Sequence, residues 1–197
     1  KKRALEIFDA VHTSLKNTSS MAALATTPEE AIKIGKTGKR AIFIGVENGY
    51  TIGHDLGMLQ KFYDLGTRYM TLCHSSNNDI CDSSTDPKGA EYQGLSSLGE
   101  QVVKEMNRLG LIIDVSHVSD STFYDVVRLS KVPVVATHSG AKAICNHPRN
   151  LTDDMLKALA KNGGVVQLNL LSDYVKTIPP SAEREAAMKA LYTKYNI

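Results

Sequence analysis

The sequence predicts an α/β fold, a TIM-type (β/α)8 barrel of which this chain carries about six strands. Short runs that are apolar along their whole length alternate with helical patterns, as in parallel sheets that are covered by helices. Four of these runs lead into residues that can bind a metal or move a proton. Because these residues follow consecutive strands, and no glycine-rich phosphate loop follows the first strand, a barrel is favoured over an open doubly wound sheet.

The composition is that of an ordered globular protein. Of the 197 residues, 42% are hydrophobic and 22% are charged, so we expect one domain over residues 1–197. The formal charge of +2 is spread along the chain, and the only basic cluster is Lys1–Arg3, which argues against nucleic-acid binding. No apolar stretch approaches the roughly 20 residues of a membrane span. The sequence leaves a homodimer open.

The N-terminal part predicts a helix, a strand and a second helix. Residues 2–16 place apolar side chains at helical spacing, and a short apolar strand follows at residues 21–25. Thr27 then supplies an N-cap, Pro28 the first helical position, and a glutamate completes a capping box. This helix is expected to end near residue 38.

The next two strands carry the first two of the four marked residues. The apolar run at residues 41–46 leads into Glu47, and the run at residues 69–73 leads into His74. Between them, residues 56–65 have the pattern of an amphipathic helix that a glycine closes.

Two further strands continue the pattern. Residues 111–116 lead into His117, and residues 133–137 lead into His138. Ser97 is the expected N-cap of the helix before the first of these strands. Helices are expected at residues 97–109, 119–129 and 152–159.

The end of the chain predicts a sixth strand at residues 165–171 and a last helix at residues 181–195. A complete barrel of this type has eight strands and about 250 residues. The sequence opens inside a helical pattern without an initiator Met and closes inside another helix. We therefore expect an internal segment of a longer barrel, truncated at both ends.

One connection is much longer than the others. Residues 75–96 are rich in Asn, Asp, Ser and Gly, and structureless loops of this length are usually functional lids or mobile. Because the connection starts directly after His74, we expect it to lie over the site.

Glu47, His117 and His138 are candidate metal ligands. Carboxylate oxygen and imidazole nitrogen suit Zn²⁺ and its neighbours, and with no thiolates among them a catalytic site is favoured over a structural one. Glu47 could bridge two metals roughly 3.5 to 4 Å apart. A single strand histidine is more often a hydrogen-bonded core residue, and Glu47 could instead be salt-bridged across the barrel mouth. Three such residues at successive strand ends favour the metal.

The other polar candidates have weaker signals. Asp114 lies inside a strand and must be paired, or hydrogen-bonded behind the site. Arg149 could bind a substrate carboxylate through two hydrogen bonds, or cap a loop at the surface. His12 is expected at the surface, His54 at a helix cap and His147 in a loop.

The three cysteines indicate no disulfide framework and no thiolate zinc site, because Cys73, Cys81 and Cys145 are odd in number and lack a Cys-X-X-Cys pair. Buried thiols are expected instead. A nucleophile pair of Cys73 and His74 is disfavoured, since adjacent strand residues point to opposite faces.

Five long segments resemble one known family. They are IGVENGYTI, RYMTLCHSSNND, GLSSLGEQVVKEMNRLGLIIDVSHVSD, PVVATHSGAKAICNHPRNLTDDML and GGVVQLNLL. In order and spacing they resemble the membrane (renal) dipeptidase family of zinc peptidases, within the metal-dependent hydrolases. The resemblance covers nearly the whole chain from about residue 40 onward.

The resemblance implies a barrel enzyme with two zinc ions that cleaves dipeptides. By position, Glu47 is similar to the bridging carboxylate, and His117 and His138 to ligands of the second zinc. His74 is similar to the residue that polarises the scissile carbonyl, and Arg149 to the anchor of the dipeptide carboxylate. In such a site the metals lower the pKa of a shared water, and the bridging hydroxide attacks the peptide carbonyl.

Three departures from the family pattern matter. No His-X-Asp pair, which would complete the first zinc site, occurs in this chain, and the late strand with a catalytic aspartate is absent. Tyr50 stands where many members have histidine. We therefore expect this segment alone to be inactive and a longer polypeptide to be active.

Two other functions stay open from the sequence. One is an amidohydrolase acting on another small amide or a lactam, which Arg149 would discriminate because only substrates with a free carboxylate need it. The other is a non-catalytic barrel fragment that binds metal.

Overall fold

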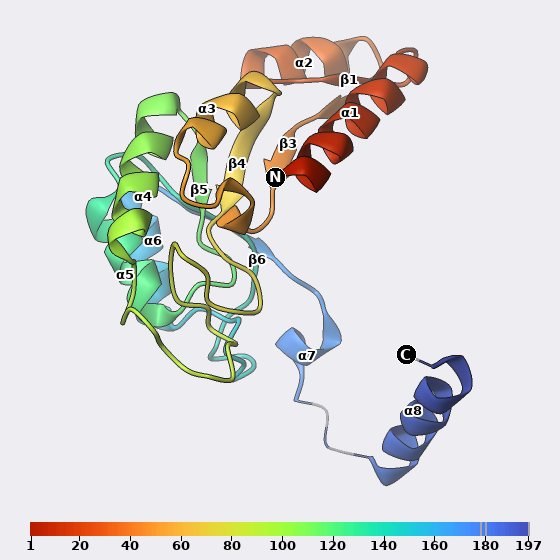
Figure 1. Cartoon of the computed structure of the whole chain (residues 1–197), viewed down its shortest axis with the longest axis vertical. Coiled ribbons are helices and arrows are strands. Elements are labelled where there is room, and N and C mark those ends of the chain that lie inside the picture. The colour runs from red at the N-terminus through yellow and green to blue at the C-terminus, as the bar shows by residue number, and fades with distance from the viewer. Residues whose placement is uncertain (178, 180, 197) are drawn as a thin grey trace.

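The computed structural model describes residues 1–177, 179 and 181–196, and its fold is of the α/β class (Figure 1). Five parallel strands form the main sheet in the order β3-β4-β5-β6-β7, and β1 and β2 form a separate parallel pair. The strands are β1 Ala22–Leu24, β2 Arg40–Ile42, β3 Ile44–Val46, β4 Thr67–Thr71, β5 Ile112–Asp114, β6 Val135–Ser139 and β7 Val165–Leu168. The expected strands are all present.

The expected helices are also present, and α3 to α6 lie along one side of the main sheet (Figure 1). The helices are α1 Lys2–Asn17, α2 Pro28–Lys36, the 3-10 turn η1 Gly49–Ile52, α3 Gly57–Asp64, α4 Ser97–Leu109, α5 Asp120–Leu129, α6 Asp153–Asn162, α7 Ser172–Val175 and α8 Ala182–Tyr195. The sequence did not predict η1 or α7. The cap of α4 is Ser96, whose hydroxyl accepts from the Gly99 N–H, so the prediction of Ser97 was wrong by one residue.

The run at residues 41–46 is two strands rather than one. β2 pairs with β1, the chain breaks at Phe43, and β3 pairs with β4. The sequence pattern does not predict such a break, because the run is apolar throughout and the segments before and after Phe43 are both extended. The consequence is that β3 ends directly before Glu47 and carries this residue to the edge of the main sheet.

The core lies between the main sheet and helices α3 to α6. Burying each large apolar side chain there stabilises the fold by roughly 1.5 to 3 kcal/mol. Helix α4 comes so close to the long connection that a Cβ on Gly99 would overlap the Ile80 carbonyl oxygen. The largest fully buried side chains include Leu59, Phe62, Met70, Met106, Ile113, Phe123, Met155 and Leu159.

The connection at residues 75–96 is held in place by its own side chains. The buried Asp82 carboxylate accepts backbone N–H groups of Glu91 (2.8 Å), Tyr92 (3.0 Å) and Gly94 (3.0 Å). Asn78 Nδ2 donates to the carbonyl oxygen of Leu72 at 2.9 Å. The segment therefore has a defined conformation, although, as expected, it forms no helix or strand.

The C-terminal part packs less than the rest. From β7 onward most side chains are exposed, and helix α8 stands apart from the sheet without a buried residue (Figure 1). In the part of the chain that the structure describes, no helix combines the length and the apolar character that a membrane crossing needs.

Candidate metal centre

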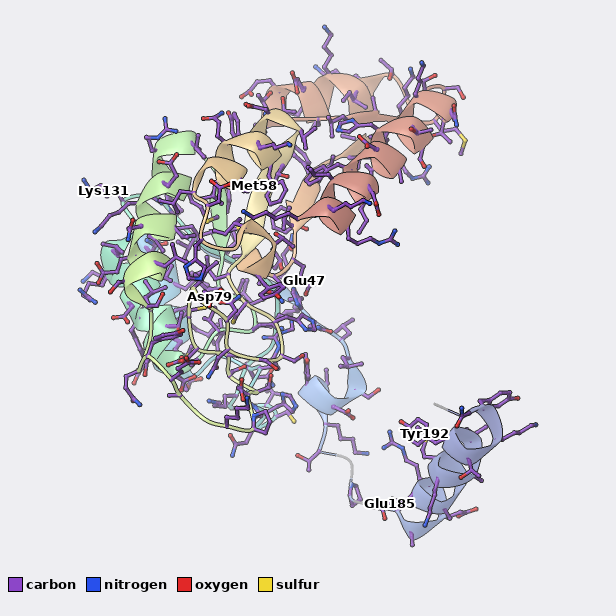
Figure 2. All side chains as sticks on the ribbon, in the orientation of Figure 1. Glu47, Met58, Asp79, Lys131, Glu185 and Tyr192 are labelled. Atoms are coloured by element: carbon purple, nitrogen blue, oxygen red, sulfur yellow. The ribbon has the colours of Figure 1, made fainter. Side chains whose placement is uncertain are left out.

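Four side chains meet at the carboxyl edge of the main sheet, where the sequence predicted them. One of them, Glu47, is labelled in Figure 2. Glu47 Oε1 lies 3.2 Å from Nε2 of both His117 and His138, and 3.8 Å from Nε2 of His74. The Nε2 atoms of His117 and His138 are 2.8 Å apart. The carboxyl ends of four adjacent strands therefore converge on one point.

The donor atoms of Glu47, His117 and His138 fit a divalent cation of the zinc type. One oxygen and two ring nitrogens lie within 4.8 Å of one another, with the nitrogens closer together than any other pair of donors. Imidazole nitrogen and carboxylate oxygen are ordinary zinc ligands. Within the described ranges, this is the only such group of histidine, cysteine and acidic side chains.

The backbone of His117 is in the left-handed region. Its φ is +73°, which costs a non-glycine residue on the order of 1 to 3 kcal/mol. The long connection binds its carbonyl oxygen: the Ser84 N–H donates at 2.8 Å, and the Ser83 Oγ, whose proton points to the His74 carbonyl oxygen, lies 3.4 Å away. The long connection thus holds His117 in the conformation that turns its ring toward the cluster.

His117 is held neutral. Burial, followed by the positive charges of Arg149, His74 and His138, lowers the pKa of its imidazole to about 3. The Glu47 carboxylate acts in the opposite sense but is half exposed, so burial dominates. A neutral ring keeps a lone pair on one of its two nitrogens at physiological pH, as metal binding requires.

Asp114 is buried directly behind the cluster. Its Oδ2 accepts hydroxyl protons from Thr71 and Thr137, both at 2.6 Å. Its Oδ1 accepts backbone N–H groups of Ser116 (2.9 Å) and Thr137 (3.0 Å). Thr137 Oγ1 in turn lies 2.8 Å from Nδ1 of His138. The prediction that Asp114 must be hydrogen-bonded behind the site is confirmed, and all four of its donors are neutral.

His74 lies at the open side of the cluster. Its side chain is 48% exposed, its ring is 4.2 Å from that of His117, and Ser75 Oγ is 3.0 Å from its Nδ1. The Ser83 hydroxyl donates to its carbonyl oxygen at 2.6 Å. The neighbouring Cys73 is fully buried, and Cys81 and Cys145 are buried as well, which confirms that the thiols are buried.

Arg149 is buried beside the cluster without a carboxylate partner. It is only 4% exposed, and one Nη donates to the His138 carbonyl oxygen at 3.0 Å. Its Nε has no hydrogen-bond partner, and no acidic group pairs with it among the described residues. Burial lowers the pKa of its guanidinium. The alternative of a surface arginine was wrong, and a buried cation of this kind is suited to an incoming anion.

The remaining histidines lie outside the cluster. His12 is half-buried with Nε2 2.9 Å from the Leu65 carbonyl oxygen, so the prediction of a surface residue was wrong. His54 lies 3.2 Å from Asp79 and caps no helix, which corrects the expected capping role. His147 lies in a loop, as expected.

Sequence reasoning missed four residues that shape the site. Ser83 and Ser84 hold the backbone of two histidines, Thr137 contacts His138, and the ring of Tyr174 lies 5.6 Å from the Arg149 guanidinium. Only Thr137 carried a signal, since it directly precedes a candidate ligand. The serines lie in a run of similar polar residues, which marks none of them.

Known proteins resemble this chain in sequence and in structure. The profile of the membrane dipeptidase family (peptidase family M19) matches residues 1–194. Dipeptidase verJ of Clonostachys rogersoniana is 37% identical over 185 residues, which make up 94% of this chain and 47% of that protein. The probable dipeptidase PvdM from Pseudomonas aeruginosa superposes with a TM-score of 0.84 at 31% identity, covering 96% of this chain and 48% of that one.

A third relative was solved with a ligand. A metallopeptidase from Rhodobacter sphaeroides, liganded with a phosphinate mimic of the dipeptide L-Ala-D-Ala, superposes with a TM-score of 0.76 at 27% identity. The match covers 93% of this chain and 56% of that one. The chain thus spans about half the length of these relatives. Dipeptidases of this family have a TIM-type barrel, so the parallel sheet is part of such a barrel and the predicted fold class is confirmed.

Proposed function

Since the chain belongs to the membrane dipeptidase family, we propose that the protein containing it hydrolyses dipeptides with zinc ions bound at the edge of the main sheet. The observation that carries this proposal is the convergence of Glu47, His117 and His138 next to a buried arginine that lacks a carboxylate partner. Cleavage of a peptide bond next to a free carboxylate requires a metal site beside an anion-binding site.

Glu47, His117 and His138 are the proposed metal ligands. The rings of His117 and His138 would hold one zinc ion, and Glu47 would be shared with a second ion, whose other ligands would come from residues outside this sequence. When bound, zinc supplies a Lewis acid that polarises the peptide carbonyl and lowers the pKa of water toward neutrality. The chain itself supplies neutral, preoriented nitrogen donors.

His74 is proposed to stabilise the negative charge that develops on the carbonyl oxygen. Its ring lies at the open side of the cluster, beside His117, where a substrate can reach it. A positioned donor acts most strongly when it is aimed at charge that appears only in the transition state. The hydrogen bond from Ser83 to the His74 carbonyl oxygen fixes the backbone that carries this donor.

Arg149 is proposed to bind the free carboxylate of the substrate. It is linked to the metal ligands through a single hydrogen bond to the His138 carbonyl oxygen. The anion site and the metal site are therefore joined through the backbone of His138. A substrate can fill both sites only if its scissile bond lies close to its carboxylate. This proximity favours a dipeptide over an amide or lactam without a carboxylate. A guanidinium can bind a carboxylate through two parallel hydrogen bonds.

The test is a dipeptide hydrolysis assay with added Zn²⁺ on two samples, the 197-residue chain and a longer polypeptide that contains it. We expect turnover by the longer polypeptide only, because Glu47 and the two histidines complete just one zinc site. If the longer polypeptide shows neither turnover nor bound zinc, the proposed enzyme is refuted. If the 197-residue chain nevertheless binds zinc, a non-catalytic metal-binding fragment is favoured. Turnover by the chain alone would refute the need for further ligands.

The matched control substrate is the C-terminal amide of the same dipeptide. The proposal predicts that the amide is a much poorer substrate, since it cannot pair with the Arg149 guanidinium. Equal hydrolysis of the two would instead indicate an amidohydrolase that acts on other small amides.

A further inference from the structure

One carboxylate joins three strands of the main sheet directly below the metal ligands. Asp114 on β5 accepts the hydroxyl of Thr71 from β4 and the hydroxyl of Thr137 from β6. Both distances are 2.6 Å, the length of a hydrogen bond to an ionised oxygen. Its other oxygen is occupied by two backbone N–H groups. Asp114 therefore acts only as an acceptor.

The Thr137 hydroxyl has a single proton and three polar neighbours, which are Asp114 Oδ2 at 2.6 Å, His138 Nδ1 at 2.8 Å and Ser116 Oγ at 3.5 Å. Because the carboxylate can only accept, that proton points to Asp114 Oδ2. Of the other two neighbours of Thr137 Oγ1, the nearer is Nδ1 of His138, at 2.8 Å. The hydroxyl can meet this nitrogen only as an acceptor, so Nδ1 must carry the proton of the neutral ring.

We propose that Asp114 is a positioning residue that acts through the Thr137 hydroxyl to keep the proton of His138 on Nδ1. The Nε2 lone pair then faces Glu47 Oε1 at 3.2 Å and His117 Nε2 at 2.8 Å. The inference rests on the proposed role of His138 as a metal ligand. Ring nitrogens remote from a metal generally donate to a neighbouring acceptor, which fixes the tautomer.

The two proposed histidine ligands, His117 and His138, differ in how they are held in place. Nδ1 of His117 is buried and has no hydrogen-bond partner among the described residues. His117 is instead fixed by its backbone, through Ser83 and Ser84. Only His138 is connected to Asp114, and its backbone N–H is also held, by the Ser116 hydroxyl at 3.0 Å.

The test compares four variants of the full chain. Thr137→Val keeps the shape of the side chain but removes the hydroxyl, and Thr137→Ser restores it. Asp114→Asn replaces an acceptor oxygen by a donor, which reverses the direction of the hydrogen bonds. Thr71→Val is the matched control, because it removes an equally short hydrogen bond to Asp114 without touching His138.

The first readout is the ¹⁵N NMR spectrum of the histidines in the metal-free protein, which identifies the protonated nitrogen of His138. We expect the Nδ1–H tautomer in the wild type, in Thr137→Ser and in Thr71→Val, and a mixture with Nε2–H in Thr137→Val and Asp114→Asn. An Nε2–H tautomer of His138 in the wild type would overturn the proposal. This result needs no variant, so it can be obtained even if a variant fails to fold. This readout involves no hydrolysis, so it is independent of the proposed dipeptidase activity.

The second readout is zinc affinity, measured by competition with a chelator on variants whose thermal unfolding shows that they are folded. We expect the Kd for Zn²⁺ to rise roughly 10- to 100-fold in Thr137→Val and in Asp114→Asn. Thr137→Ser and Thr71→Val are expected to stay within about twofold of the wild type. A folded Thr137→Val variant with wild-type zinc affinity would overturn the proposal.

Discussion

The two sides of the candidate metal centre are built differently. On the β5–β6 side, the side chains of His117 and His138 are 8% and 30% exposed, and hydrogen bonds hold the backbone of both. On the β3–β4 side, the side chains of Glu47 and His74 are about half exposed. The difference separates a buried side, which is fixed in advance for the proposed metal, from a side that is open to solvent and to the proposed substrate.

The cause is the polar network under the closed side. Asp114 and the serine and threonine residues around it place donors and acceptors below β5 and β6, whereas the polar partners of Glu47 in the described part of the chain are the three histidine rings. A buried network that is fully hydrogen-bonded specifies one geometry. An exposed carboxylate and an exposed imidazole can move to meet a second metal or a substrate.

The largest expected effect separates the two sides by zinc affinity. His138→Asn removes a ligand from the closed side, and we expect a loss of more than about 100-fold in affinity, beyond the 10- to 100-fold typical for residues behind a ligand. His74→Asn on the open side is expected to leave zinc affinity within about twofold while lowering hydrolysis by the longer polypeptide about 10²- to 10³-fold. Isothermal titration with Zn²⁺ and a dipeptide assay measure the two quantities. Equal zinc affinities for the two variants would contradict the division into sides.

The next effect concerns Arg149, which lies on the closed side but is proposed to bind the substrate carboxylate. Removing one partner of a buried, hydrogen-bonded charge pair costs about 2 to 5 kcal/mol, so Arg149→Ala should raise KM for dipeptides by at least about 30-fold. Zinc affinity should change little. The control is the dipeptide amide, whose KM should be the same for variant and wild type. A rise in KM for both substrates would show that Arg149 maintains the structure of the site and does not bind the substrate carboxylate.

The third effect is a dependence of stability on pH. The folded-state pKa of His117 is about 3 and its unfolded value is 6.5, so between these values the unfolded chain binds the extra proton. Stability should therefore fall as the pH drops from about 6.5 toward 3, by at most about 1.4 kcal/mol per pH unit. Urea unfolding of the metal-free protein at pH 7, 6 and 5 measures this slope. His117→Gln should reduce the slope of the free energy of unfolding against pH. An unchanged slope in this variant would assign the pH dependence to other groups.

The smallest effect is expected for a pair on the open side. His54 and Asp79 lie 3.2 Å apart, but their side chains are 76% and 47% exposed. Exposed ion pairs contribute about 0 to 1 kcal/mol, so His54→Ala should change the free energy of unfolding by less than about 1 kcal/mol. Chemical denaturation compares the variant with the wild type. A larger loss would show that the open side is also fixed in advance.

Much of the fold was visible in the sequence because the signals are local. The cap at Thr27, the period of each helix and the apolar runs all depend on near neighbours in the chain, and parallel strands bring their carboxyl ends together. The convergence of Glu47, His74, His117 and His138 followed from that rule.

The features that the sequence did not reveal depend on distant contacts. The break at Phe43 exists because one run pairs with two different sheets, and the ordered loop exists because Asp82 meets backbone groups about ten residues later. The partners of Asp114 come from β4 and β6, 43 and 23 residues away. No periodicity encodes such contacts.

The most direct test of the account is X-ray absorption at the zinc edge of the full chain loaded with one equivalent of Zn²⁺. We expect two imidazole nitrogens at about 2.0 to 2.1 Å and a carboxylate oxygen at about 2.0 to 2.2 Å, from His117, His138 and Glu47. In His138→Asn, one imidazole should disappear from the spectrum. A spectrum without imidazole, or one that is the same for the wild type and His138→Asn, would contradict the proposed metal centre.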